Sequence, residues 1–238
     1  MNAMLAALLF TCLAMAQAPK PEARAWTILP LGDSMTECSR DYGCYRTELA
    51  RMIAQAGYHA KFVGSRHNDW EPEAMRHDGY SGKTAEFLAG EMERIYTANP
   101  ADVILLHSGH NHFIEEAPIP GIVEASERII RIARQVNPRV IVLLAQVVEV
   151  GKLPKYAYIP DLNREIAKLA QRLDTRSQSV VLVNQAAGFD YRTDTVADLV
   201  HPNAQGARKI ASRWFEALQP ILSREPEAAS GPAPRKTP

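Results

Sequence analysis

Residues 26–34 read Trp-Thr-Ile-Leu-Pro-Leu-Gly-Asp-Ser, a mainly apolar run that ends in a glycine. This pattern is typical of a buried strand followed by a sharp turn. We therefore predict a strand over residues 26–31, with Asp33 and Ser34 just past its carboxyl end. In an open sheet of parallel strands, ligands bind beyond that end, so this turn is the first candidate for a functional site.

The rest of the chain alternates between short apolar runs and segments with helical periodicity. The apolar runs predict further strands at residues 60–63, 103–106, 140–148 and 180–183. The periodic segments predict helices at residues 45–56, 84–96, 122–133, 161–173 and 203–222. Residues 65–82 are polar and aperiodic and predict a long loop. Because the strands are apolar throughout, we expect an α/β fold with a doubly wound, five-stranded parallel sheet in flavodoxin-like order.

The composition is that of an ordinary globular domain without excess charge. Hydrophobic residues make up 46% of the chain, and 27 basic residues balance 27 acidic ones. Neither nucleic acid nor an anionic membrane surface is therefore expected as a partner. We expect one monomeric domain over residues 26–222, followed by a disordered tail rich in Pro, Ala, Glu and Lys over residues 223–238.

The amino-terminal segment predicts export. Residues 1–16 are largely apolar and end in Ala14-Met15-Ala16, which fits the small-x-small site of a secretory signal peptide. The run is too short to span a bilayer, so no stable membrane insertion is expected. We expect a secreted or periplasmic protein with a linker over residues 17–25. In an oxidising compartment, Cys38 and Cys44 form either a disulfide that closes the loop after Ser34 or two free thiols, and we favour the disulfide.

Residues near the end of the chain complement Ser34. A serine hydroxyl is a weak nucleophile until a base removes its proton, and His201 is a candidate for that base. Asp198 precedes His201 by one turn, so its carboxylate could bind the second imidazole nitrogen. The three residues have the chemistry of a serine hydrolase. The alternative is that Ser34 and His201 each cap the helix that follows them in the sequence.

Two further residues could stabilise the oxyanion that forms when a serine attacks a carbonyl. Asn111 follows the strand predicted at residues 103–106, which places it at the same sheet edge as Ser34. Its side-chain amide, the Gly79 N–H and the Ser34 N–H are candidate donors. As isolated residues, Asn111 and Gly79 could equally be ordinary turn residues.

Rival mechanisms have less support. His107, His110 and His112 are close in sequence and could bind zinc, but no carboxylate lies between them and their spacing does not require them to converge. We therefore expect no metal and no cofactor. The chain has no Gly-x-Ser-x-Gly motif, which argues against an α/β-hydrolase.

Taken together, these segments resemble the SGNH (GDSL-type) hydrolase superfamily, and most closely the acetyl xylan esterases of carbohydrate esterase family three. The supporting stretches are residues 29–34, 43–46, 61–65, 77–82, 103–107, 188–190, 198–203 and 211–214. Ser34, Gly79, Asn111 and His201 match the four named positions of the superfamily in order. The resemblance implies a triad of Ser34, His201 and Asp198, an oxyanion hole from Ser34, Gly79 and Asn111, and removal of acetyl groups from a polysaccharide.

The expected substrate is an acetylated carbohydrate or another small ester. We predict substrate contacts from Asp33, Tyr80, His110 and Trp70. The loops at residues 66–76 and 151–158 are mostly polar, and their Trp70 and Tyr156 suit a sugar ring better than a long acyl chain. His112 departs from the family, which usually has an aspartate there. The alternatives are a lysophospholipase or short-chain lipid esterase on the same site, or a non-catalytic carbohydrate-binding protein.

Overall fold

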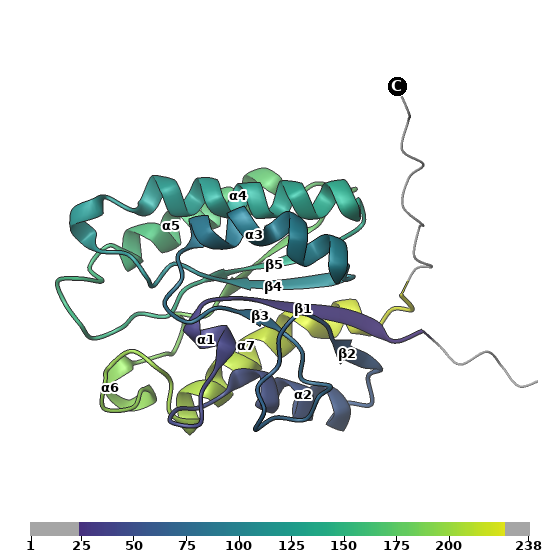
Figure 1. The fold of residues 1–238 in the computed structure, drawn as a ribbon, viewed down its shortest axis with the longest axis horizontal. Helices are drawn as coiled ribbons and strands as arrows, with labels where there is room; N and C mark the ends of the chain where they lie inside the picture. Colours follow the sequence, from purple (N-terminus) through teal and green to yellow (C-terminus); the bar gives the residue numbers. More distant parts are fainter. Residues whose placement is uncertain (1–23, 227–238) are drawn as a thin grey trace, which may run out of the picture.

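Strand β1 (Trp26–Gly32) lies inside a parallel sheet and pairs with three other strands. A computed structural model describes residues 24–226 of the chain (Figure 1). The other strands are β2 (Ala60–Phe62), β3 (Asp78–Gly79), β4 (Val103–His107), β5 (Ile141–Gln146) and β6 (Val180–Asn184). The main path runs β2-β1-β4-β5-β6, and every pairing is parallel. This confirms the predicted α/β fold with flavodoxin-like strand order.

Helices cover both faces of the sheet (Figure 1). One face carries α2 (Tyr45–Gln55) and α7 (Ala204–Leu222). The other carries α3 (Ala85–Ala98), α4 (Ile119–Val136) and α5 (Ile159–Leu173). Three shorter elements complete the described part of the chain: α1 (Ser34–Glu37), the 3₁₀ turn η1 (Ile114–Glu116) and α6 (Tyr191–Asp194). Because both faces are covered, all five residues of β4 are buried.

The ends of the helices follow from local sequence signals. Thr84 caps α3 by accepting a hydrogen bond from the Phe87 N–H, and Asn203 caps α7 by accepting from two backbone N–H groups. Helix α2 ends just before Gly57, which has a φ of 75°. These signals explain why the predicted helix boundaries lie close to the observed ones.

Two strand predictions differ from the structure. The apolar run at residues 140–148 predicts a longer strand than β5, which ends at Gln146. The buried side chain of Asn163 binds both the N–H and the carbonyl of Val147, so these groups are not available to a neighbouring strand. The loop predicted at residues 65–82 also contains β3, in which Gly79 pairs with Gly32 of β1, so the sheet has six strands among the described residues where five were predicted.

Two predictions concern residues at the ends of the chain. The predicted signal peptide and most of the predicted linker and tail lie outside residues 24–226, so they stay predictions. Among the described residues, no helix combines the length and the apolar content that crossing a bilayer requires.

Candidate active site

Ser34 begins helix α1 directly after β1, at the carboxyl edge of the sheet. Asp33 caps this helix, because its Oδ1 accepts a hydrogen bond from the Met35 N–H at 3.0 Å. Gly32 is required at this point, since a Cβ there would collide with the carbonyl oxygen of His107 on β4. The capping role that was the alternative for Ser34 therefore belongs to Asp33, and the Ser34 hydroxyl points elsewhere.

The Ser34 hydroxyl is hydrogen-bonded to His201. The Oγ–Nε2 distance is 2.9 Å, and His201 Nδ1 lies 2.6 Å from Asp198 Oδ2. The other Asp198 oxygen accepts from the backbone N–H groups of Val200 and His201. The three residues that the sequence predicts as nucleophile, base and carboxylate thus form one hydrogen-bonded chain.

The turn that carries Asp198 keeps the carboxylate ionised. Burial raises the pKa of Asp198, but the hydrogen bonds from His201 and from two backbone N–H groups outweigh this effect and leave the pKa lowered. Leu199 has a φ of 59°, a left-handed conformation that folds the turn back on itself. The turn does not cap α7, because Asn203 does so. An ionised Asp198 holds the Nδ1 proton of His201 and directs Nε2 to Ser34.

Tyr42, which was not predicted as a site residue, contacts both Ser34 and His201. Its ring stacks on the His201 ring with centroids 4.3 Å apart and an angle of 19° between the planes. Its hydroxyl donates to the Ser34 carbonyl at 3.0 Å. The disulfide between Cys38 and Cys44 closes the loop around Tyr42, which confirms the predicted pairing. An aromatic residue between the two cysteines was the signal available in the sequence.

The predicted oxyanion donors differ in their availability. The Gly79 N–H donates to Nδ1 of the buried His77 at 3.0 Å. Burial lowers the pKa of His77 to about 2, so its ring stays neutral and able to accept this bond. In the structure the Gly79 N–H thus has an acceptor within the protein, and its role as an oxyanion donor stays a prediction. Asn111 Nδ2 donates to the Lys83 carbonyl at 2.9 Å, and its second N–H has no acceptor among the hydrogen bonds of residues 24–226.

The structure revises three of the residues expected to meet substrate. Asp33 and His110 are fully or almost fully buried, so neither is exposed to a ligand. Tyr156 is 7% exposed and packs against His110. His110, in the loop after β4, lies 3.5 Å from Asp33, and its Nε2 lies 2.9 Å from the Val148 carbonyl in the loop after β5.

The aromatic residues Tyr80 and Trp70 have different surroundings. The Tyr80 hydroxyl donates to Asp78, and its ring packs edge-on against Phe87, so its contacts are within the protein. Trp70 lines an open cavity of about 510 Å³ together with His201. The other lining residues are Glu37, Cys38, Ser39, Arg40, Asp41, Tyr42 and Ser81. Of the four predicted substrate contacts, Trp70 is the one that this cavity brings beside His201.

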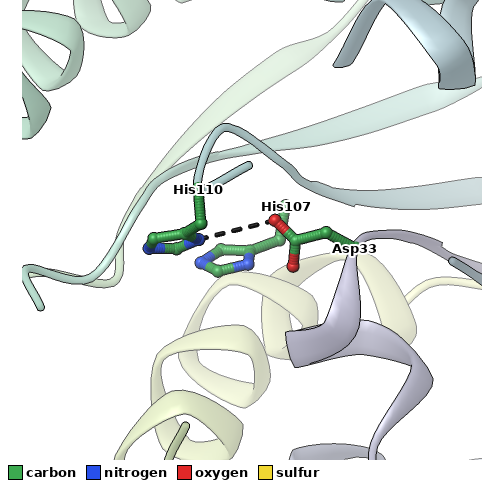
Figure 2. A group of neighbouring side chains, drawn as sticks. All are labelled: Asp33, His107 and His110. Carbon is green, nitrogen blue, oxygen red and sulfur yellow. Dashed lines mark ion pairs between the residues drawn. The ribbon is translucent and has the colours of Figure 1, made fainter. Parts of the chain in front are cut away.

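The three histidines near β4 do not form one group. His112 pairs with Glu86 of α3 at 2.8 Å and ties the loop of Asn111 to that helix. His107 and His110 instead face Asp33 (Figure 2). Burial lowers the pKa of His107 to about 4, against the opposing effect of Asp33. The carboxylate missing from the local sequence is thus supplied by a distant residue.

The fold and the site together define the GDSL class of hydrolases: a Gly-Asp-Ser turn after the first strand, and an Asp-x-x-His turn before the last helix. The sequence pattern described as the GDSL-like lipase/acylhydrolase family matches residues 31–209. The chain belongs to this family.

Several proteins with similar sequence or structure are named as esterases. The chain is 28% identical over 247 residues to a multidomain esterase of Ruminococcus flavefaciens, covering 90% of this chain and 31% of that protein. The chain thus spans about a third of the length of this relative. A carbohydrate esterase family 3 structure from Talaromyces cellulolyticus has a TM-score of 0.74 at 26% identity, covering 83% of this chain and 98% of that one. A Clostridium thermocellum family 3 carbohydrate esterase has a TM-score of 0.69 at 28% identity, with 84% and 98% covered.

Another similar structure is an acetyl esterase mutant with an acetate ion. Its TM-score is 0.73 at 25% identity, covering 83% of this chain and 98% of that one.

Proposed function

We propose that the protein is a serine esterase that removes acetyl groups from a carbohydrate through Ser34, His201 and Asp198. The observation that carries the proposal is the continuous hydrogen-bonded chain from the Ser34 hydroxyl to the Asp198 carboxylate. In this chain His201 Nδ1 carries the proton, and the free electron pair of Nε2 faces the hydroxyl.

The hydrogen-bonded residues Ser34, His201 and Asp198 support hydrolysis in two steps. Ser34 Oγ attacks the acetyl carbonyl carbon while His201 Nε2 takes the hydroxyl proton, and the carbonyl electron pair moves to oxygen. When the oxyanion collapses, the sugar oxygen leaves with the proton from His201 and the acetyl group stays on Ser34. Water then gives a proton to His201, attacks this acetyl group and releases acetate. His201 returns the proton to Ser34 Oγ.

The oxyanion is assigned to the Asn111 amide and the Ser34 backbone N–H. The Lys83 carbonyl fixes one Asn111 N–H, which orients the amide and leaves the other N–H for the developing charge. Gly79 takes part only if its N–H leaves His77, so the effect of this residue on turnover is expected to be secondary.

A small acyl group on a sugar fits the cavity beside His201. The lining combines the aromatic faces of Tyr42 and Trp70 with the charged side chains of Glu37, Arg40 and Asp41. Aromatic faces pack on sugar rings, and charged groups bind hydroxyls. The acetyl esterase with acetate and the two family 3 carbohydrate esterases among the similar structures support the same substrate class.

The substrate is tested by comparing kcat/KM for p-nitrophenyl acetate, butyrate and octanoate, and then for acetylated xylan and a phospholipid. We expect acetate to be preferred over octanoate, and acetylated xylan over phospholipid. In the variant Trp70→Ala, KM for acetylated xylan should rise while p-nitrophenyl acetate turnover stays near wild type. Phe113→Ala is the matched control, because Phe113 is an exposed aromatic that does not line the cavity.

The outcomes of this experiment separate the alternatives. A preference for octanoate or phospholipid would replace the carbohydrate with a lipid and leave the serine mechanism intact. Absence of turnover with every ester would favour a non-catalytic carbohydrate-binding protein.

We also propose that the protein is exported and cut after Ala16. The Cys38–Cys44 disulfide supports this, because such bonds persist in oxidising compartments. Mass spectrometry of protein from the medium or periplasm should give Gln17 as the first residue. Uncut protein retained inside the cell would contradict the proposal.

A further inference from the structure

Three buried side chains converge beneath the Gly-Asp-Ser turn (Figure 2). Asp33 is 0% exposed, His107 1% and His110 2%, and one potential ligand atom from each lies within 4.8 Å of the others. Asp33 Oδ2, His110 Nδ1 and both ring nitrogens of His107 have no hydrogen-bond partner among the described residues. Buried polar atoms are normally satisfied, so this group requires a shared partner.

A hydrogen bond at His110 Nε2 indicates which ring nitrogen carries the proton. The other nitrogen, Nδ1, faces Asp33. His110 Nε2 lies 2.9 Å from the carbonyl oxygen of Val148, which only accepts hydrogen bonds. Nε2 therefore carries a proton. In the neutral ring Nδ1 then has a free electron pair, which faces Asp33 Oδ2 at 3.5 Å. Two acceptors face each other, so a positively charged or donating species belongs between them.

The distances favour a metal ion over a single proton. A charged N–H···O pair closes to about 2.7–2.9 Å, and a proton shared by Asp33 and His110 would leave both nitrogens of His107 unsatisfied. In a tetrahedral zinc site, bonds of about 2.0–2.2 Å place neighbouring ligand atoms about 3.4 Å apart. The separation of 3.5 Å between His110 Nδ1 and Asp33 Oδ2 matches this value, and a ligand atom of His107 lies within 4.8 Å of both residues' ligand atoms. A metal ion would also engage His107 as a third ligand.

Two of the three ligands have the outer contacts that are typical of a metal site. His110 donates its remote N–H to a backbone carbonyl, and Asp33 Oδ1 accepts from the Met35 N–H. Such outer contacts orient metal ligands and fix their protonation. Two imidazoles and one carboxylate are a ligand set that Zn²⁺ and similar transition metals prefer over Ca²⁺ or Mg²⁺.

We propose that Asp33, His107 and His110 bind one divalent transition-metal ion, with Zn²⁺ the best match. The sequence alone pointed away from this site, because it grouped His112 with the other histidines and offered no carboxylate. The ion would join the turn before Ser34 to the loop before Asn111 and act as a structural brace. The proposal does not rest on the proposed reaction, because the three side chains are buried and supply no group to the substrate.

Metal content of the purified full-length protein tests the site directly. After incubation with Zn²⁺ and dialysis, elemental analysis should give one ion per chain. His110→Ala should lose the ion, and the conservative variant Asp33→Asn should bind it much more weakly. His112→Ala is the matched control, because His112 lies in the same loop but pairs with Glu86. It should keep a full equivalent.

Two measurements on the unchanged chain keep the test valid if a variant fails to fold. Zn²⁺ added to chelator-treated protein should raise the Tm, since a ligand that binds only the folded state stabilises it. Co²⁺ in place of Zn²⁺ should give the intense visible absorption of a four-coordinate site. The proposal would be overturned if wild-type protein bound no metal, if Zn²⁺ left its Tm unchanged and if Co²⁺ gave no such absorption. If nitrogen NMR shows that His110 Nδ1 is protonated and that its signal does not change when Zn²⁺ is added, a proton rather than a metal ion lies between His110 and Asp33.

Discussion

Replacing Tyr42 tests whether the ring stacked on His201 contributes to turnover. When His201 takes the Ser34 proton it becomes a cation, and the Tyr42 ring lies parallel to it at 4.3 Å. Stacking of a cation on an aromatic face contributes about 0.5–1 kcal/mol when exposed and about 2 kcal/mol when desolvated. The His201 side chain is 24% exposed, which places it between these limits. A loss of about 1–2 kcal/mol in Tyr42→Leu corresponds to a decrease in kcat/KM of roughly 5- to 30-fold.

Tyr42→Phe separates the ring from the hydroxyl. Burial, followed by nearby carboxylates led by Glu37, raises the pKa of Tyr42, so the hydroxyl stays protonated and donates to the Ser34 carbonyl. Removing this one hydrogen bond should decrease kcat/KM only a few-fold, because such a bond contributes about 1 kcal/mol. The stack should remain.

The assay is p-nitrophenyl acetate hydrolysis, with kcat and KM measured at one pH on the activity plateau. In Tyr42→Leu kcat/KM should fall, because the His201 cation loses its aromatic neighbour. Tyr42→Phe should stay within a few-fold of wild type. A leucine variant with the wild-type kcat/KM would refute the reasoning, and a phenylalanine variant as slow as the leucine variant would transfer the effect to the hydroxyl.

Four further predictions follow from the site. Ser34→Ala should reduce turnover by about 10³-fold or more with unchanged circular dichroism, and near wild-type kcat would exclude this nucleophile. Asn111→Ala should lower kcat by about 10²- to 10³-fold at constant KM, whereas a pure KM effect would make Asn111 a substrate-positioning residue. Asp198→Asn should lower kcat by roughly 10⁴-fold, because the His201 tautomer is no longer fixed. The folded-state pKa of Asp198 lies below 3.8, so its stabilising effect is complete above that pH and fades in stronger acid. Below that pH, the free energy of unfolding of Asp198→Asn should therefore change less with pH than that of the wild type.

The sequence was sufficient for features that depend on pattern and sheet direction. Apolar runs identified β1 and β4, and parallel pairing places the carboxyl ends of such strands at one edge. This pattern predicts that Ser34 and Asn111 lie at the same edge of the sheet. The Asp-x-x-His spacing and the helix that follows were likewise visible as local signals.

Features that depend on side-chain direction in loops were not accessible from pattern. The Gly79 N–H donates to His77 because the latter is buried beside it, which no spacing rule predicts. Asp33 and His110 were expected to face substrate, but both are buried and their side chains lie 3.5 Å apart. Periodicity assigns a face to a residue in a strand or helix, whereas the direction of a loop side chain is set by tertiary packing.

The placement of β1 has a consequence for the order of assembly. The first strand pairs with β2, β3 and β4. Its hydrogen bonds therefore cannot all form until residues as far along the chain as His107 are in place. Ser34 and His201 are 167 positions apart, and the turn that carries His201 follows the last strand. Closing contacts of such long range is slow and depends on the preceding structure. Ester hydrolysis should therefore be the last property to appear during refolding, after helical content has recovered, which makes turnover a reporter of complete folding.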